Sequence, residues 1–67
     1  MTPGMKRWLH EHGLTAVRVA EAAGMLVPDL YRQLSGRMPV QPELPKTLRG
    51  IFGMTAEEYE TTMPKRA

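Results

Sequence analysis

Apolar side chains recur at intervals of three and four residues along most of the chain, which is the spacing of helices with one buried face. This pattern predicts five short helices, at 5–12, 16–23, 28–34, 45–52 and 56–63. No stretch alternates apolar and polar residues for long enough to form a strand. We therefore expect one compact all-α domain over residues 1–67, with flexible ends at 1–4 and 64–67.

Capping and turn residues separate the predicted helices. Thr15 and Thr55 precede two of them, and Glu58 completes a capping box with Thr55. Gly24 supplies the positive φ that a sharp reversal after a helix needs. Three prolines in seven residues exclude a regular helix at 36–45, so we expect a loop there.

The helical spacing also predicts the core. The inward positions are expected to be Met5, Trp8, Leu9, His12, Val19, Ala20, Ala23, Leu30, Leu34, Leu48, Ile51 and Phe52. A buried indole N–H usually finds a hydrogen-bond partner, so we expect one for Trp8.

Composition excludes several classes of protein. There is no cysteine, which excludes disulfides and thiolate metal sites and fits a cytoplasmic location. No window approaches the roughly 18 apolar residues of a membrane span, so we expect no membrane association. The net charge is only +2, but residues 1–53 carry seven Lys and Arg against four Asp and Glu. This basic excess fits an anionic partner.

The sequence offers no set of catalytic or metal-binding residues. His10 and His12 are two positions apart and would point to nearly opposite sides of a helix, so they cannot share an ion. Glu57 and Glu58 occupy the first turn of a predicted helix, where the helix dipole favours carboxylates. We therefore expect no enzyme activity, no cofactor and no metal.

Residues 15–36 predict a helix, a tight turn and a second helix. Ala20 is small where the second helix must approach, and Gly24 follows it by four residues. Met25 in the turn and Leu30 in the second helix are expected to pack into the core. This layout is typical of the helix-turn-helix, whose second helix enters the major groove of DNA.

The segments GLTAVRVAEAAGM and LYRQLSGR, with IFGM before a threonine-capped helix, resemble the Cro/repressor helix-turn-helix family of lambda-type phages. That family also includes bacterial regulators and antitoxins. The resemblance covers nearly the whole chain and implies a five-helix lambda repressor-like fold. It further implies a phage- or mobile-element-type transcriptional repressor that binds a near-palindromic operator on double-stranded DNA as a homodimer.

The resemblance also implies site residues. Base contacts would come from Val27, Pro28, Tyr31 and Arg32, and backbone contacts from Thr15, Ala16, Ser35 and Arg37. Of these, Arg32 is best suited to a bidentate contact with guanine. Asp29 would repel phosphates unless it accepts a hydrogen bond from cytosine N4 or only caps its own helix, and we expect the cap.

Two features depart from the family pattern. Leu26, Val27 and Pro28 stand where the family usually has polar residues, so hydrogen-bonding to bases at this helix start is poor. Gln33 stands where an apolar residue is usual. Either Leu34 has taken over the packing role or the second helix is rotated.

Two kinds of protein partner are expected. Four apolar residues near the C-terminus exceed what a small core needs and would form the homodimer interface: Phe52, Met54, Tyr59 and Met63. The alternative function is a protein-interaction module with Tyr31 and Val27 in an apolar patch, such as the antitoxin of a toxin–antitoxin pair or a partner of an antirepressor.

Overall fold

A computed structural model describes residues 1–64, and all regular structure in that range is helical. The elements are α1 (Pro3–Glu11), α2 (Ala16–Ala23), α3 (Val27–Leu34), α4 (Glu43–Pro45), the π-helical segment η1 (Lys46–Ile51) and α5 (Ala56–Thr62). Because α4 runs directly into η1, the two form one continuous helix. The predicted all-α class with five helices is confirmed for the described residues. The predicted flexible end lies outside them from residue 65 onward.

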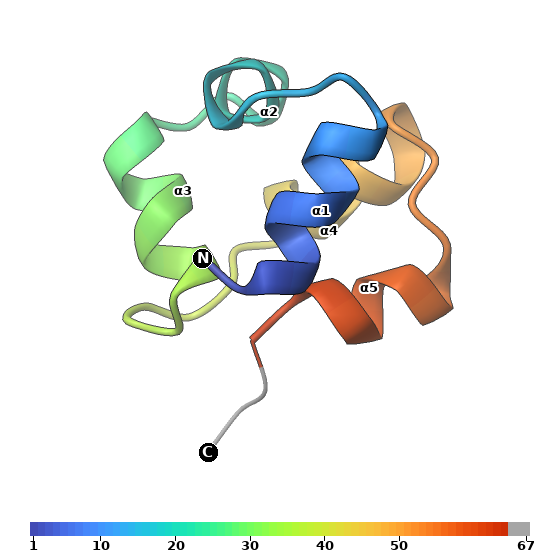
Figure 1. The fold of residues 1–67 in the computed structure, drawn as a ribbon. Coiled ribbons are helices and arrows are strands. Elements are labelled where there is room, and N and C mark those ends of the chain that lie inside the picture. The colour runs from blue at the N-terminus through green and yellow to red at the C-terminus, as the bar shows by residue number, and fades with distance from the viewer. Residues whose placement is uncertain (65–67) are drawn as a thin grey trace.

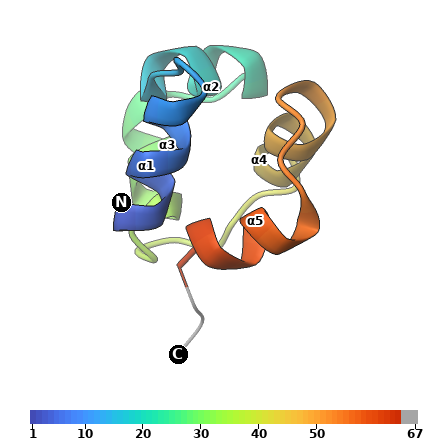
Figure 2. The same cartoon turned by 45° about the vertical axis from the view of Figure 1, so that its right-hand side comes forward.

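The helices surround a single core, with α1 in front of it in Figure 1. α2 lies above α1 in this view, α3 to its left, and α5 below it toward the lower right. α5 packs against α1, while α2 packs against both α3 and η1. In the turned view of Figure 2, α4 and α5 lie on the same side of α1. The outer surface of α3 is therefore on the far side of the molecule from α5 in Figure 1.

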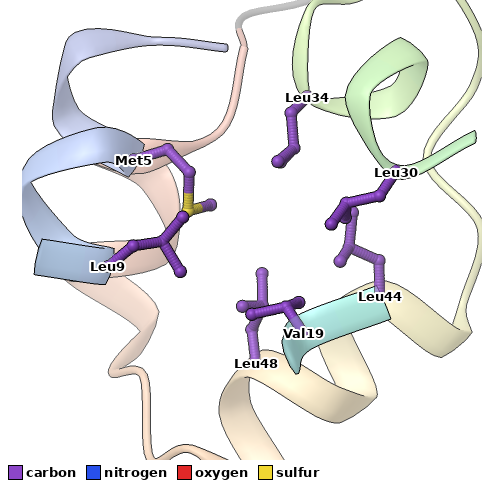
Figure 3. Close-up of a pocket in the computed structure, with 7 residues that line it drawn as sticks. All are labelled: Met5, Leu9, Val19, Leu30, Leu34, Leu44 and Leu48. Atoms are coloured by element: carbon purple, nitrogen blue, oxygen red, sulfur yellow. The ribbon is translucent and has the colours of Figure 1, made fainter. Parts of the chain in front are cut away.

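The core is built from buried apolar side chains of α1, α2, α3, α4 and η1, with Met54 and Met63 on either side of α5. Figure 3 shows seven of them pointing toward one another: Met5, Leu9, Val19, Leu30, Leu34, Leu44 and Leu48. No cavity large enough for a water molecule lies between them, as expected for a close-packed interior. Trp8 and Ala20 are also buried, so most of the predicted inward positions are confirmed.

The N-terminus is more ordered than predicted. α1 begins at Pro3 rather than Met5, so the first four residues are not a frayed end. Thr2 caps this helix, with proline in its first turn, and the Thr2 hydroxyl donates to the carbonyl oxygen of Thr62 in α5. Gly4 lies so close to α5 that a Cβ atom would be 2.8 Å from the Thr61 carbonyl oxygen. Glycine therefore allows α1 and α5 to meet.

The fourth helix differs from its prediction in start and winding. It begins at Glu43, so the predicted loop is shorter, and its later part is π-helical. The Phe52 N–H donates to the Thr47 carbonyl oxygen, five residues back, at 3.2 Å. This wider winding buries Thr47 and Leu48 but turns Ile51 outward, where 63% of it is exposed. The predicted inward position of Ile51 was wrong for that reason, and Phe52 is half-buried.

Two predictions at the end of α1 were also wrong. His12 is the exposed C-cap of α1, and its ring Nδ1 lies 2.8 Å from the Trp8 carbonyl oxygen at the end of the helix, so the ring does not enter the core. Its ring stacks on Trp8, with 4.2 Å between the ring centroids. The buried Trp8 Nε1 has no hydrogen-bond partner within residues 1–64. The nearby Glu58 carboxylate is bound instead to the backbone N–H of Thr55, at 2.9 Å.

Candidate nucleic-acid interface

The unit formed by α2, a three-residue turn and α3 has the predicted limits to within one residue. The Thr15 hydroxyl accepts the Arg18 backbone N–H at 3.2 Å, which caps α2. α2 ends at Gly24, whose φ is +69°, and the Met25 N–H then donates to the Ala20 carbonyl oxygen at 3.0 Å. This left-handed end reverses the chain sharply, so that α3 packs directly against α2.

The orientation of α3 is fixed by three buried side chains, Leu30, Gln33 and Leu34. Gln33 keeps the inward position and Leu34 packs beside it, so α3 is not rotated to expose the amide. Tyr31 and Arg32 face outward. Leu26, directly before α3, is 70% exposed and caps the helix without a side-chain hydrogen bond.

Gln33 holds both ends of α3 in place. Its Oε1 accepts the backbone N–H of Gln41 at 2.8 Å, and its Nε2 donates to Met25 Sδ at 3.5 Å. A buried amide is costly unless its polar atoms are bonded, and here both are. Gln33 thus ties the loop after α3 and the turn before α3 to one side chain. The sequence marked Gln33 as unusual but gave no indication of these two partners.

Arg32, the best candidate for a base contact, is paired on its own helix. Its Nη1 lies 2.9 Å from Asp29 Oδ1, and the two side chains are 59% and 37% exposed. Asp29 lies in the first turn of α3, where the helix dipole also favours its carboxylate. An exposed ion pair of this kind contributes at most about 1 kcal/mol to stability. Arg32 can therefore exchange Asp29 for another partner at little cost.

The four residues predicted to contact bases occupy one side of α3. Val27, Pro28, Tyr31 and Arg32 are spaced so that they form a continuous stripe on a helix. Pro28, Tyr31 and Arg32 are exposed, but Val27 is half-buried and packs against the core. The exposed part of the stripe is therefore smaller than predicted.

The residues predicted to contact the DNA backbone lie at the two ends of this unit. Thr15 is exposed and Ala16 is half-buried at the start of α2. Ser35 Oγ donates to the Arg32 carbonyl oxygen at 3.3 Å. The Arg37 backbone N–H donates to the same oxygen at 2.9 Å, which holds exposed Arg37 beside the end of α3.

The residues predicted to form the dimer interface lie in two different environments. Met54 and Met63 belong to the buried core, so the expectation that they are surplus to the core was wrong. The small core uses both of them because α5 and the segment before it close one side of it. Phe52 and Tyr59 are half-buried and pack against the core.

Residues 1–64 contain no group of three or more His, Cys, Asp or Glu side chains placed to hold a metal ion. Within the same range, no helix has the length and apolar character needed to cross a membrane. Comparisons with protein-family models, curated proteins and solved structures find no match to the chain.

Proposed function

We propose that this protein is a sequence-specific DNA-binding transcriptional repressor that places α3 in the major groove. The observation that carries the proposal is the exposed stripe of Pro28, Tyr31 and Arg32 on a helix whose opposite face is buried and bonded. A helix fits the major groove of B-DNA, where every base pair presents a distinct pattern of donors and acceptors. Arginine is the side chain most often used to read guanine there.

Charged and polar groups on both sides of the stripe support this proposal. Arg18 is exposed on the first turn of α2, and Arg37 is exposed beyond the end of α3. Arginines and the N–H groups at a helix start are common ligands of DNA phosphates. Contacts of this kind would orient α3 in the groove.

We further propose that the protein acts as a homodimer on a near-palindromic operator. α3 has eight residues and presents only three exposed side chains in the stripe, so one copy reads few base pairs. Two copies on half-sites one helical turn apart would combine two such contacts and raise both affinity and specificity.

The test is a selection of binding sites from a pool of random DNA duplexes. We expect enrichment of an inverted repeat with half-site centres about 10–10.5 base pairs apart, bound with a strong dependence on salt. Arg32→Ala should weaken the enrichment and relax the preference at the base pair that Arg32 contacts, whereas Arg49→Ala, which changes an exposed arginine on η1, serves as the matched control. A wild-type selection that returns no motif would refute the proposal.

A second candidate function is binding of a protein partner, such as the toxin of a toxin–antitoxin pair. The observation that favours it is the exposure of apolar Leu26 and of Tyr31 at the start and middle of α3. Leu26→Ser should then abolish partner binding while Arg32→Ala leaves it intact. If instead Arg32→Ala weakens DNA binding and Leu26→Ser leaves it intact, the result supports the first function.

A further inference from the structure

A cleft of about 410 Å³ lies between α1 and α5, which pack against each other (Figure 1). α1 contributes Arg7, Trp8 and Glu11 to its walls, and α5 contributes Glu58 and Thr61. No residue of α2 or α3 lines it. A volume of this size is within the range of pockets that hold small molecules.

The indole of Trp8 brings a buried polar atom to this cleft. Only 3% of Trp8 is exposed, and its Nε1 has no hydrogen-bond partner in residues 1–64. The direction of the N–H is indicated by Glu58, because the Thr55 backbone N–H lowers the pKa of that carboxyl most and the Trp8 indole N–H lowers it further. The indole N–H therefore faces the cleft wall that Glu58 forms.

Glu58 does not satisfy this donor. Its Oε1 accepts the Thr55 backbone N–H at 2.9 Å, and the carboxylate does not come within hydrogen-bonding distance of Trp8 Nε1. A buried donor is costly unless an acceptor binds it. The cleft therefore suits a molecule that carries an oxygen acceptor at this point.

The charged side chains of the cleft indicate which molecule fits. Arg7 and Glu11 are exposed and Glu58 is half-buried. None of the three is in an ion pair within residues 1–64, where the recorded pair is that of Arg32 with Asp29. Two carboxylates and one guanidinium complement a molecule with two positive charges and one negative charge. The indole N–H provides a second donor for the negative group.

We propose that this cleft binds a free α-amino acid with a side-chain ammonium group. Its α-carboxylate accepts hydrogen bonds from the Arg7 guanidinium and from Trp8 Nε1, and its two ammonium groups bind the carboxylates of Glu11 and Glu58. Such charge-assisted hydrogen bonds are stronger than neutral ones. Nε1 is shielded from solvent, so the carboxylate reaches it as the long, exposed side chains of Arg7 and Glu11 move aside.

This inference does not rest on the proposed function. No residue proposed to contact DNA lines the cleft, and ligand binding is measured without DNA. If the amino acid binds but no DNA motif is selected, the proposed function fails and this inference stands. If a motif is selected but the amino acid does not bind, the reverse holds.

Titration with L-lysine, followed by heteronuclear NMR, tests the inference. Trp8 is the only tryptophan of the chain, so its indole N–H gives a single resonance that reports on the cleft. We expect a saturable shift of this resonance with a dissociation constant of about 1–10 mM, as is reasonable for a ligand of this size. L-norleucine lacks the side-chain ammonium and cadaverine lacks the carboxylate, and each should bind about threefold more weakly or worse.

Four variants distinguish the cleft from general effects of charge. Arg7→Gln and Glu11→Gln each remove one charge from the cleft and should weaken L-lysine binding by about threefold or more. Lys6→Gln and Glu60→Gln are the matched controls, because both residues are exposed on the same two helices and do not line the cleft. They should bind as wild type does. Circular dichroism should give the same helical content for all four variants.

The inference is overturned if the indole resonance shows no saturable shift up to about 50 mM L-lysine. It is equally overturned if L-norleucine or cadaverine binds as tightly as L-lysine. Binding of L-lysine to Arg7→Gln or to Glu11→Gln with the wild-type dissociation constant would also overturn it.

Discussion

The two faces of α3 differ in what binds their polar groups. On the inward face the amide of Gln33 is fully buried and bonds to Gln41 and Met25, eight residues away on either side. On the outward face Arg32 bonds only to Asp29 on the same helix, and the Arg32 side chain remains largely in water while that of Asp29 is 37% exposed. The inward bonds therefore fix where α3 lies, and the outward pair leaves its charges available to a ligand.

This difference predicts that substitutions on the two faces of α3 affect different properties of the protein. A buried group that loses its partner pays the full cost of desolvation, whereas an exposed ion pair is largely replaced by water. Changes on the inward face should lower the stability of the whole domain. Changes on the outward face should alter binding and leave the fold intact.

Loss of Leu30 should have the largest effect. Leu30 is fully buried, so Leu30→Ala should lower the free energy of unfolding by about 2–5 kcal/mol. A domain of this size has only about 3–10 kcal/mol in total, so much of the variant should be unfolded. Urea denaturation followed by circular dichroism measures the change. Leu26→Ala, at a 70% exposed position, is the control and should stay within about 0.5 kcal/mol of wild type.

Loss of the Gln33 amide should rank second. Gln33→Leu replaces the amide with an apolar side chain of similar size and leaves the Gln41 backbone N–H without its acceptor. We expect a loss of about 1–3 kcal/mol in urea denaturation and faster hydrogen exchange at the Gln41 amide. Gln41→Leu is the matched control, because it retains the backbone N–H and changes only an exposed side chain. Equal stability of the two variants would show that Gln33 does not hold the loop.

Local signals explain why α2 and the turn were predicted well. Thr15 caps the helix through a residue three positions away, and Gly24 ends it through its own φ. Interactions between residues so close along the chain can be recognised from the sequence. The role of Gln33 was not predictable, because its partners Met25 and Gln41 approach it only when the turn and the loop fold around α3.

The other wrong predictions concern residues whose positions also depend on the fold of the whole chain. The outward position of Ile51 follows from π-helical winding, which the apolar spacing of the segment does not reveal. The burial of Met54 and Met63 follows from how the C-terminal residues close the core. The early start of α1 was the exception, since Thr2 followed by Pro3 is a local helix-start signal.

Removal of the Asp29 charge should have a smaller effect on stability and a clear one on binding. Asp29→Asn breaks the pair with Arg32 and removes a negative charge beside the proposed DNA contact. The free energy of unfolding should change by less than about 1 kcal/mol. DNA affinity, measured by fluorescence anisotropy, should increase, while Glu57→Gln on α5 should have no such effect. Weaker binding by Asp29→Asn would mean that the carboxylate itself contacts a base.

The smallest expected effect is a change in how stability depends on pH. It comes from Glu58, whose carboxylate accepts a hydrogen bond from the backbone. The hydrogen bond from the Thr55 backbone N–H lowers the pKa of Glu58 below its ordinary value of 4.5. Its contribution to stability is therefore present above the unfolded-state pKa and is lost as pH falls through the lower folded-state pKa.

Urea denaturation between about pH 6 and about pH 3 measures this contribution. Wild type should lose more stability over this range than Glu58→Gln, and Glu60→Gln should follow the wild-type curve. Parallel curves for wild type and Glu58→Gln would show that the capping carboxylate contributes nothing that depends on pH.

The central claim is that Arg32 on the outward face of α3 reads a base. Its most direct test is the ratio of dissociation constants for the selected duplex and a shuffled duplex, measured at one salt concentration for wild type and Arg32→Ala. We predict a wild-type ratio of about 10³ or more. Arg32→Ala should reduce it by about fivefold to a hundredfold, as expected for about 1–3 kcal/mol. A wild-type ratio near one, or equal weakening of both duplexes by Arg32→Ala, would contradict the claim.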